Sequence, residues 1–164
     1  MVTAAGEWAI DPPTGLLVVA GGSFLARQAA GFAAVPPDLL SSSGWRGYWT
    51  GADYARNYGL MDDNFKLARA SSASQDVLNQ AYAYESKLHD VEAEDWLFLD
   101  RLSECHLLPS RASSLFDLVA TRAASTKFRT IVSVASLEAA VDQHDASRAF
   151  QALFEDPFVA TVIS

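Results

Sequence analysis

The feature that most constrains the fold of this chain is a regular apolar stripe between residues 75 and 107. Eight apolar residues recur there at alternating spacings of four and three, interrupted only at Asp95, in a stretch without glycine or proline. They are Val77, Ala81, Tyr84, Leu88, Val91, Phe98, Leu102 and Cys105. This spacing places them on one face of an α-helix, so it predicts an amphipathic helix over about 75–107.

The sequence leaves two arrangements of that helix open. A continuous helix would be about 50 Å long, whereas a domain of 164 residues is about 30–35 Å across. One long helix would therefore project and pack against a partner or a second copy of the chain. Alternatively, the helix breaks near His89 and Asp90, with Asp90 as the cap of a second helix, and a helical hairpin results.

The rest of the chain alternates between predicted helices and strands. Apolar and β-branched runs predict strands at Leu16–Ala20, Phe128–Val134 and Phe158–Ile163. Capping residues and breakers predict further helices over 51–58, 62–70, 115–124, 137–143 and 146–155. The strand–helix–strand order over 128–163 predicts a right-handed βαβ-like unit. We therefore expect a helix-dominated α+β fold, with one long amphipathic helix or helical hairpin and a small sheet.

The length favours a single domain over residues 1–164. Within it we distinguish a strand–helix and aromatic-rich region over 1–70, the long helix or hairpin over 75–107, and a helix–strand–helix–strand region over 110–164. One cysteine, Cys105, excludes an internal disulfide.

The net charge of −8 is concentrated in two segments. Residues 85–104 contain seven acidic and two basic residues, and residues 138–156 contain five and one. The intervening residues 105–137 contain one acidic and four basic residues. An acidic chain of this kind is not expected to bind nucleic acid, because phosphate groups would repel it.

The sequence also predicts where the protein resides. Residues 1–13 contain no lysine or arginine, unlike a secretory or transit peptide. The only run of membrane length, residues 15–35, has Arg27 and Gln28 near its middle, so we do not expect a membrane span. We expect an intracellular protein, cytoplasmic unless a presequence has been removed and the protein occupies an organelle interior.

No complete catalytic or metal-binding motif occurs in the sequence. The histidines are His89, His106 and His144, and the adjacent pair Cys105–His106 would point about 100° apart on a helix. Neither a nucleophile–base pair nor a zinc site follows from that spacing. We therefore assign no catalytic, cofactor-binding or metal-binding residue, expect no cofactor, and favour a non-enzymatic protein while leaving enzyme activity open.

Aromatic and arginine residues cluster in a short segment, residues 45–58. These residue types are enriched at the energetic centres of protein interfaces. Together with four residues of the stripe they are the candidate interface residues: Trp45, Arg46, Tyr48, Trp49, Tyr54, Arg56, Tyr84, Leu88, Val91 and Phe98. The cluster and the stripe predict a protein–protein interaction function, such as an accessory subunit of a larger assembly or a small acidic inhibitor or immunity-type protein. The partner is another protein or a second copy of this chain.

A second hypothesis comes from the predicted turn at Gly21 and Gly22. The order of strand, glycines and a helix capped by Ser23 resembles, loosely, the start of the dinucleotide-binding unit of extended short-chain dehydrogenases. The G-x-G-x-x-G spacing of that unit is absent here, and no P-loop pattern occurs. The alternative function is a small α/β enzyme, or a domain that binds a nucleotide or sugar phosphate at this turn.

Overall fold

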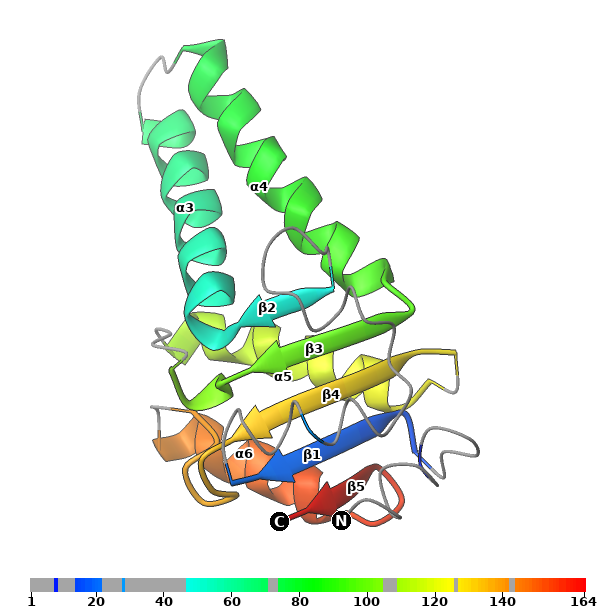
Figure 1. Cartoon of the computed structure of the whole chain (residues 1–164). Helices are drawn as coiled ribbons and strands as arrows, with labels where there is room; N and C mark the ends of the chain where they lie inside the picture. Colours follow the sequence, from blue (N-terminus) through cyan, green and yellow to red (C-terminus); the bar gives the residue numbers. More distant parts are fainter. Residues whose placement is uncertain are drawn as a thin grey trace.

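The computed structural model describes residue 8, residues 14–21, residue 28, and residues 47–70, 74–104, 109–125, 127–141 and 144–164. These residues form a helix-dominated α+β structure with one small parallel sheet. The sheet order is β2-β3-β4-β1-β5, and all pairs are parallel (Figure 1). Its strands are β1 (Leu16–Ala20), β2 (Tyr48–Thr50), β3 (Trp96–Asp100), β4 (Arg129–Val134) and β5 (Ala160–Ile163).

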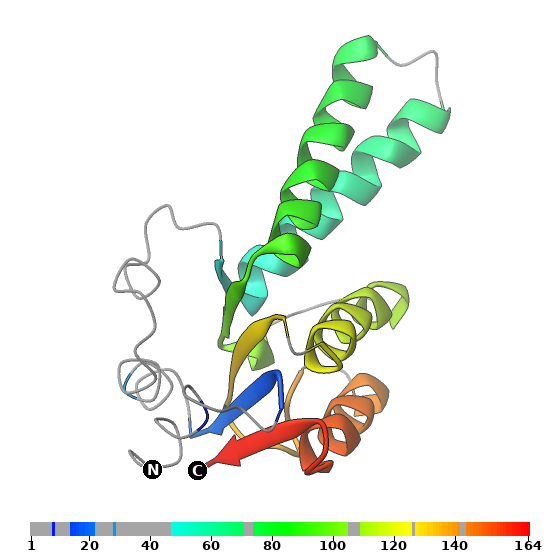
Figure 2. The same cartoon turned by 90° about the vertical axis from the view of Figure 1, so that its right-hand side faces the viewer.

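The central strands are buried on both faces, which explains their continuous apolar sequences. One face packs against α5 (Pro109–Ala123) and α6 (His144–Glu155), which lie together on that side of the sheet (Figure 2). On the opposite face Leu17 and Ile131 are buried. There Trp8 packs edge-on against Trp96, with ring centroids 6.2 Å apart.

Two antiparallel helices form a hairpin that projects from the β2 end of the molecule (Figures 1 and 2). They are α3 (Gly51–Ala70) and α4 (Gln75–Ala93). At the base of the hairpin Leu88 and Val91 are buried in the core. Near the tip the helices meet through an edge-on pair of Phe65 and Tyr82, and Tyr82 is 52% exposed. The hairpin is therefore anchored at its base and open to solvent at its tip.

The turn from β2 into α3 is a capping box that begins at Thr50. The amide of Asp53 donates to the Thr50 hydroxyl at 3.0 Å, and that hydroxyl donates to the Asp53 carboxylate at 2.7 Å. Burial raises the pKa of Asp53, but hydrogen bonds from Thr50 and Arg56 outweigh it, and the pKa lies below its ordinary value. The cap fixes the point where the hairpin leaves the sheet.

A buried arginine, Arg122 of α5, ties the base of the hairpin to the sheet. Its Nε donates to the Thr130 hydroxyl at 2.9 Å, and its Nη1 donates to the carbonyl of Glu92 at 2.9 Å. Longer bonds reach the carbonyls of Val91 and Arg129, at 3.5 and 3.4 Å. A cation at the last carbonyls of α4 also complements the negative end of the helix dipole.

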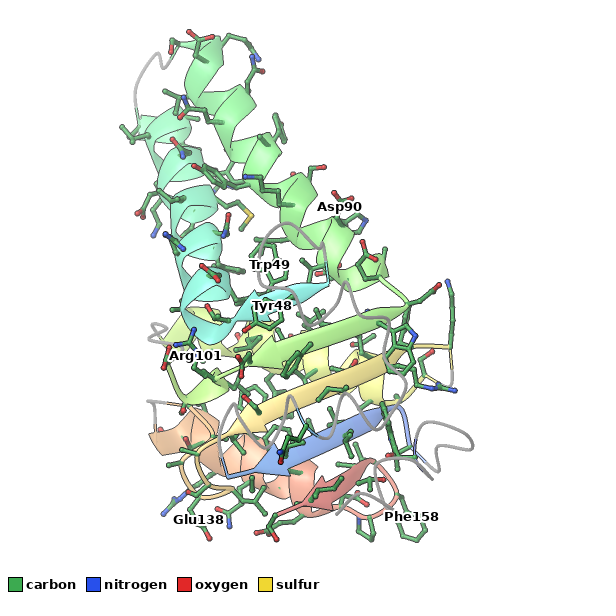
Figure 3. The ribbon with its side chains drawn as sticks, in the orientation of Figure 1. Tyr48, Trp49, Asp90, Arg101, Glu138 and Phe158 are labelled. Carbon is green, nitrogen blue, oxygen red and sulfur yellow. The ribbon has the colours of Figure 1, made fainter. Side chains whose placement is uncertain are left out.

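The long helix predicted over 75–107 is wrong in its second half. The helix ends at Ala93, residues 96–100 form the strand β3, and a short 3₁₀ helix η2 covers Leu102–Glu104. The predicted break at His89 and Asp90 does not occur either, because both lie inside α4 (Figure 3). A hairpin does exist, but α3 is its other arm.

Some of the remaining predictions are confirmed, and others are wrong. The strands at 16–20, 128–134 and 158–163 are confirmed to within two residues. The strand–helix–strand unit at the end of the chain is also confirmed, because β4 and β5 both run parallel to β1. The predicted helices over 51–58 and 62–70 are one helix, which passes through Gly59 without a break. Residues 137–141 form turns instead of a helix. Gly22 and Ser23 lie outside the described residues.

Candidate functional site

A buried aspartate at the carboxyl end of β3 is hydrogen-bonded by hydroxyl groups of the two neighbouring strands, β2 and β4. Asp100 is the last residue of β3 and is fully buried. Its Oδ1 accepts a hydrogen bond from the Ser133 hydroxyl of β4, and its Oδ2 accepts one from the Tyr48 hydroxyl of β2, each at 2.6 Å. A buried carboxyl group is costly unless it is hydrogen-bonded, so these two donors offset part of the cost of burying Asp100.

The residue after the aspartate adopts a rare backbone conformation. Arg101 has φ of 52°, the one positive value among the described residues other than glycine. This region costs a side-chain-bearing residue roughly 1–2 kcal/mol. The Arg101 amide donates to the Ser133 hydroxyl at 2.6 Å, and its guanidinium lies 3.9 Å from Asp100 and 3.3 Å from Glu104. Figure 3 shows Arg101 at this end of the sheet. Backbone strain of this kind gathers at ligand-binding sites.

A glycine turn follows β1 at the same end of the sheet. Gly21 has φ of 134°, which residues with a side chain rarely adopt, and its amide donates to the carbonyl of Val134 at 3.1 Å. Strand β4 separates this turn from Asp100, so the two lie about 10 Å apart across the strands. The turn and the aspartate thus flank the end of β4.

The strand order makes this edge a topological switch point. The chain passes from β1 to β2 in one direction along the sheet, and from β4 to β5 in the other direction. β1 and β4 are neighbours, and the connections that leave them lead in opposite directions, each past the other strand. Connections that leave two adjacent strands in opposite directions form a crevice at their carboxyl ends. In open parallel sheets, ligands bind at the carboxyl ends of the strands beside such a crevice.

The predicted interface residues do not form one surface. Trp45 and Arg46 lie outside the described residues. Tyr48 belongs to the Asp100 network, and its ring packs edge-on against Phe98. Four others are buried in this chain's own structure: Tyr54, Leu88, Val91 and Phe98.

The last three candidates lie at or near the hairpin. Trp49 is partly buried and packs edge-on against Tyr54. Tyr84 is half-buried on α4, with the Lys87 ammonium 5.3 Å from its ring centroid. Arg56 is exposed and pairs with Asp53.

Sequence reasoning missed Asp100, Ser133 and Arg101. The signal for Asp100 was present, because residues 96–99 are a continuous apolar run that ends at a carboxylate. That pattern is typical of a buried parallel strand with a polar residue at its carboxyl end. The strand pattern was not recognised because the same residues continue the helical spacing of the stripe.

No helix in the described ranges is both long and apolar enough to cross a membrane. In those same ranges no three histidine, cysteine, aspartate or glutamate side chains gather into a group that could hold a metal ion. No family model, curated protein or solved structure matches this chain.

Proposed function

We propose that this protein binds a phosphorylated ligand, a nucleotide with its magnesium ion, at the carboxyl edge of the sheet. The observation that carries the proposal is the juxtaposition of the Gly21 turn after β1 with buried Asp100 at the end of β3. A glycine turn can direct backbone amides toward phosphate oxygens, although the Gly21 amide itself donates to the carbonyl of Val134. A carboxylate two strands away takes the magnesium ion that such phosphates carry.

The donor set suits magnesium. This ion keeps several of its water molecules and is usually held by one or two carboxylates together with the phosphates of a bound ligand. Asp100 supplies the carboxylate, which the Tyr48 and Ser133 hydroxyls orient. Because Asp100 is fully buried, binding of the ion requires a local opening at this end of the sheet. A second protein carboxylate is not required, so a single aspartate is compatible with this role.

The sequence after β1 departs from the usual phosphate loop, G-x-x-x-x-G-K-[S/T]. With Gly21 as its first glycine, the last three positions are Ala26, Arg27 and Gln28. Arginine keeps the positive charge of the lysine, whereas Gln28 lacks the hydroxyl that would bind magnesium. We therefore propose that the protein binds the nucleotide, and that Asp100 makes more of the protein's contact with the metal ion.

A ligand screen tests this proposal. We expect Mg²⁺ with a nucleoside di- or triphosphate to raise the melting temperature, because a ligand that binds only the folded state stabilises it by mass action. Thermal unfolding is followed with nucleotides, sugar phosphates and inorganic phosphate, each with Mg²⁺ or with EDTA. The proposal fails if no phosphorylated compound shifts the transition at millimolar concentration.

We retain protein–protein interaction as a second proposed function. It is supported by the α3–α4 hairpin, which projects from the sheet (Figure 2). The outer half of the hairpin has exposed apolar side chains. Leu67 is 56% exposed and Tyr82 is 52% exposed. A projecting helical hairpin gives a partner a large accessible surface.

A further inference from the structure

Two adjoining cavities form a groove between the base of the hairpin and α5. One cavity of about 290 Å³ lies against α3 and α4, and one of about 340 Å³ lies against α5. Glu92 and Ser114 line both, so the cavities adjoin at these two residues. We call the two together the hairpin-base groove. Figure 2 shows α5 directly beside the base of the hairpin.

Aromatic rings form a fixed part of the groove wall. Tyr58 of α3 shares a hydrogen bond of 2.8 Å with the Ser114 hydroxyl of α5, which joins the two sides. The Tyr54 and Tyr58 rings are stacked, with centroids 6.2 Å apart. At the other end, the ring of Phe128 packs against the guanidinium of Arg122. Rings held in this way offer apolar faces without a further ordering cost.

The charge of the groove is negative. Three carboxylates line it, those of Glu85, Glu92 and Asp117. Glu92 contacts the His89 ring at 3.1 Å, whereas neither Glu85 nor Asp117 forms an ion pair with another described residue. Among the lining residues that the structure describes, Arg122 is the one permanent cation.

Arg122 offsets one of the three carboxylate charges and leaves the charged side chains of the described lining with a net charge of −2. It is 1% exposed, and its donors are directed to backbone carbonyls and to the Thr130 hydroxyl. A cationic side chain that enters the groove would meet exposed carboxylates and the faces of tyrosine rings. Both kinds of contact favour a lysine or arginine side chain.

We propose that the hairpin-base groove binds a basic segment of a partner protein, with an arginine or lysine side chain inserted between α4 and α5. This inference rests on the second proposed function and names the chemistry of its partner. The arrangement provides complementary charge and an aromatic wall in one place. The partner segment is extended or helical, and its positive charge determines its affinity.

A labelled peptide tests the inference. The probe is a fluorescein-labelled octapeptide with arginine at alternate positions, and its control has citrulline, which keeps the shape and removes the charge. Anisotropy titrations should show binding of the arginine peptide at low salt and about tenfold weaker binding of the citrulline peptide. Glu85→Gln, Glu92→Gln and Asp117→Asn should each weaken the arginine peptide several-fold, with a larger loss in the triple variant.

The matched control is Glu155→Gln on α6, which removes the same charge from an exposed site away from the groove. It should leave the affinity unchanged. Equal binding of both peptides, or an equal loss in Glu155→Gln and Glu92→Gln, would overturn the inference. Light scattering on the same samples measures self-association separately. If the chain self-associates but does not bind the peptide, the proposed role of the groove is wrong, and protein–protein interaction remains a proposed function.

Discussion

Asp100→Asn should weaken magnesium-dependent nucleotide binding by about 10–100-fold, the usual loss when a metal site loses an oriented group. Asparagine has nearly the same shape as aspartate, and the Tyr48 and Ser133 hydroxyls can still form hydrogen bonds with its amide. The variant should therefore fold while it loses the negative charge that attracts the ion. Isothermal titration with the nucleotide that gives the largest thermal shift, in Mg²⁺ and in EDTA, measures this effect.

Asp76→Asn is the control, because this exposed aspartate lies in the first turn of α4, at the far end of the hairpin. It should bind the nucleotide as the unchanged protein does. In EDTA, the unchanged protein and Asp100→Asn should have similar affinities. A loss of the same size with and without Mg²⁺ would mean that Asp100 maintains the fold and does not hold the ion.

Arg122→Met should lower the free energy of unfolding by about 3 kcal/mol or more, since a buried acceptor left without its partner costs roughly 1–3 kcal/mol. Methionine fills much of the space but leaves the Thr130 hydroxyl and the carbonyl of Glu92 without their donor. Burial lowers the pKa of Arg122 to about 10, although Glu94 and Asp95 act in the opposite direction. The guanidinium is therefore charged at neutral pH, where the measurement is made.

Urea denaturation at pH 7, followed by circular dichroism, measures the effect of Arg122→Met. Arg148→Met is the control, because Arg148 is exposed on α6 and its loss should cost less than about 0.5 kcal/mol. Hydrogen exchange adds a local readout, since amides in the last turn of α4 should lose protection. A destabilisation below about 1 kcal/mol would contradict the role of Arg122 in tying the hairpin to the sheet.

Local patterns in the sequence predict three of the five strands of this fold and miss β2 and β3. Leu16–Ala20 was predictable to the residue, because a short apolar run followed by glycines has few other interpretations. The stripe over 75–107 was misleading. A five-residue apolar strand placed after a helix can continue the helical spacing by coincidence, and only its pairing with β2 and β4 determines its conformation.

The candidate site was harder to predict than the fold. Gly21 was predictable as a turn after a strand, and the structure confirms it. Asp100 and Ser133 are 33 residues apart in sequence and meet only because β3 and β4 are neighbours in the sheet. A sequence does not specify strand order by local pattern, so a site built across strands emerges only with the topology. The aromatic and arginine cluster was visible in the sequence, but the burial of Tyr54 was not.

Paramagnetic broadening by Mn²⁺ tests the central claim most directly, because it locates the ion that accompanies the nucleotide. Manganese replaces magnesium in the nucleotide complex, and the amide resonances of the protein are recorded with and without it. We predict that the amides of Gly21, Arg101 and Val134 broaden most strongly, and that those of Trp96 and Arg129, about 16 Å away at the amino ends of the strands, broaden much less. Broadening that is strongest at the amino ends or along the hairpin, or no broadening anywhere, would contradict a phosphate-binding site at the carboxyl edge of this sheet.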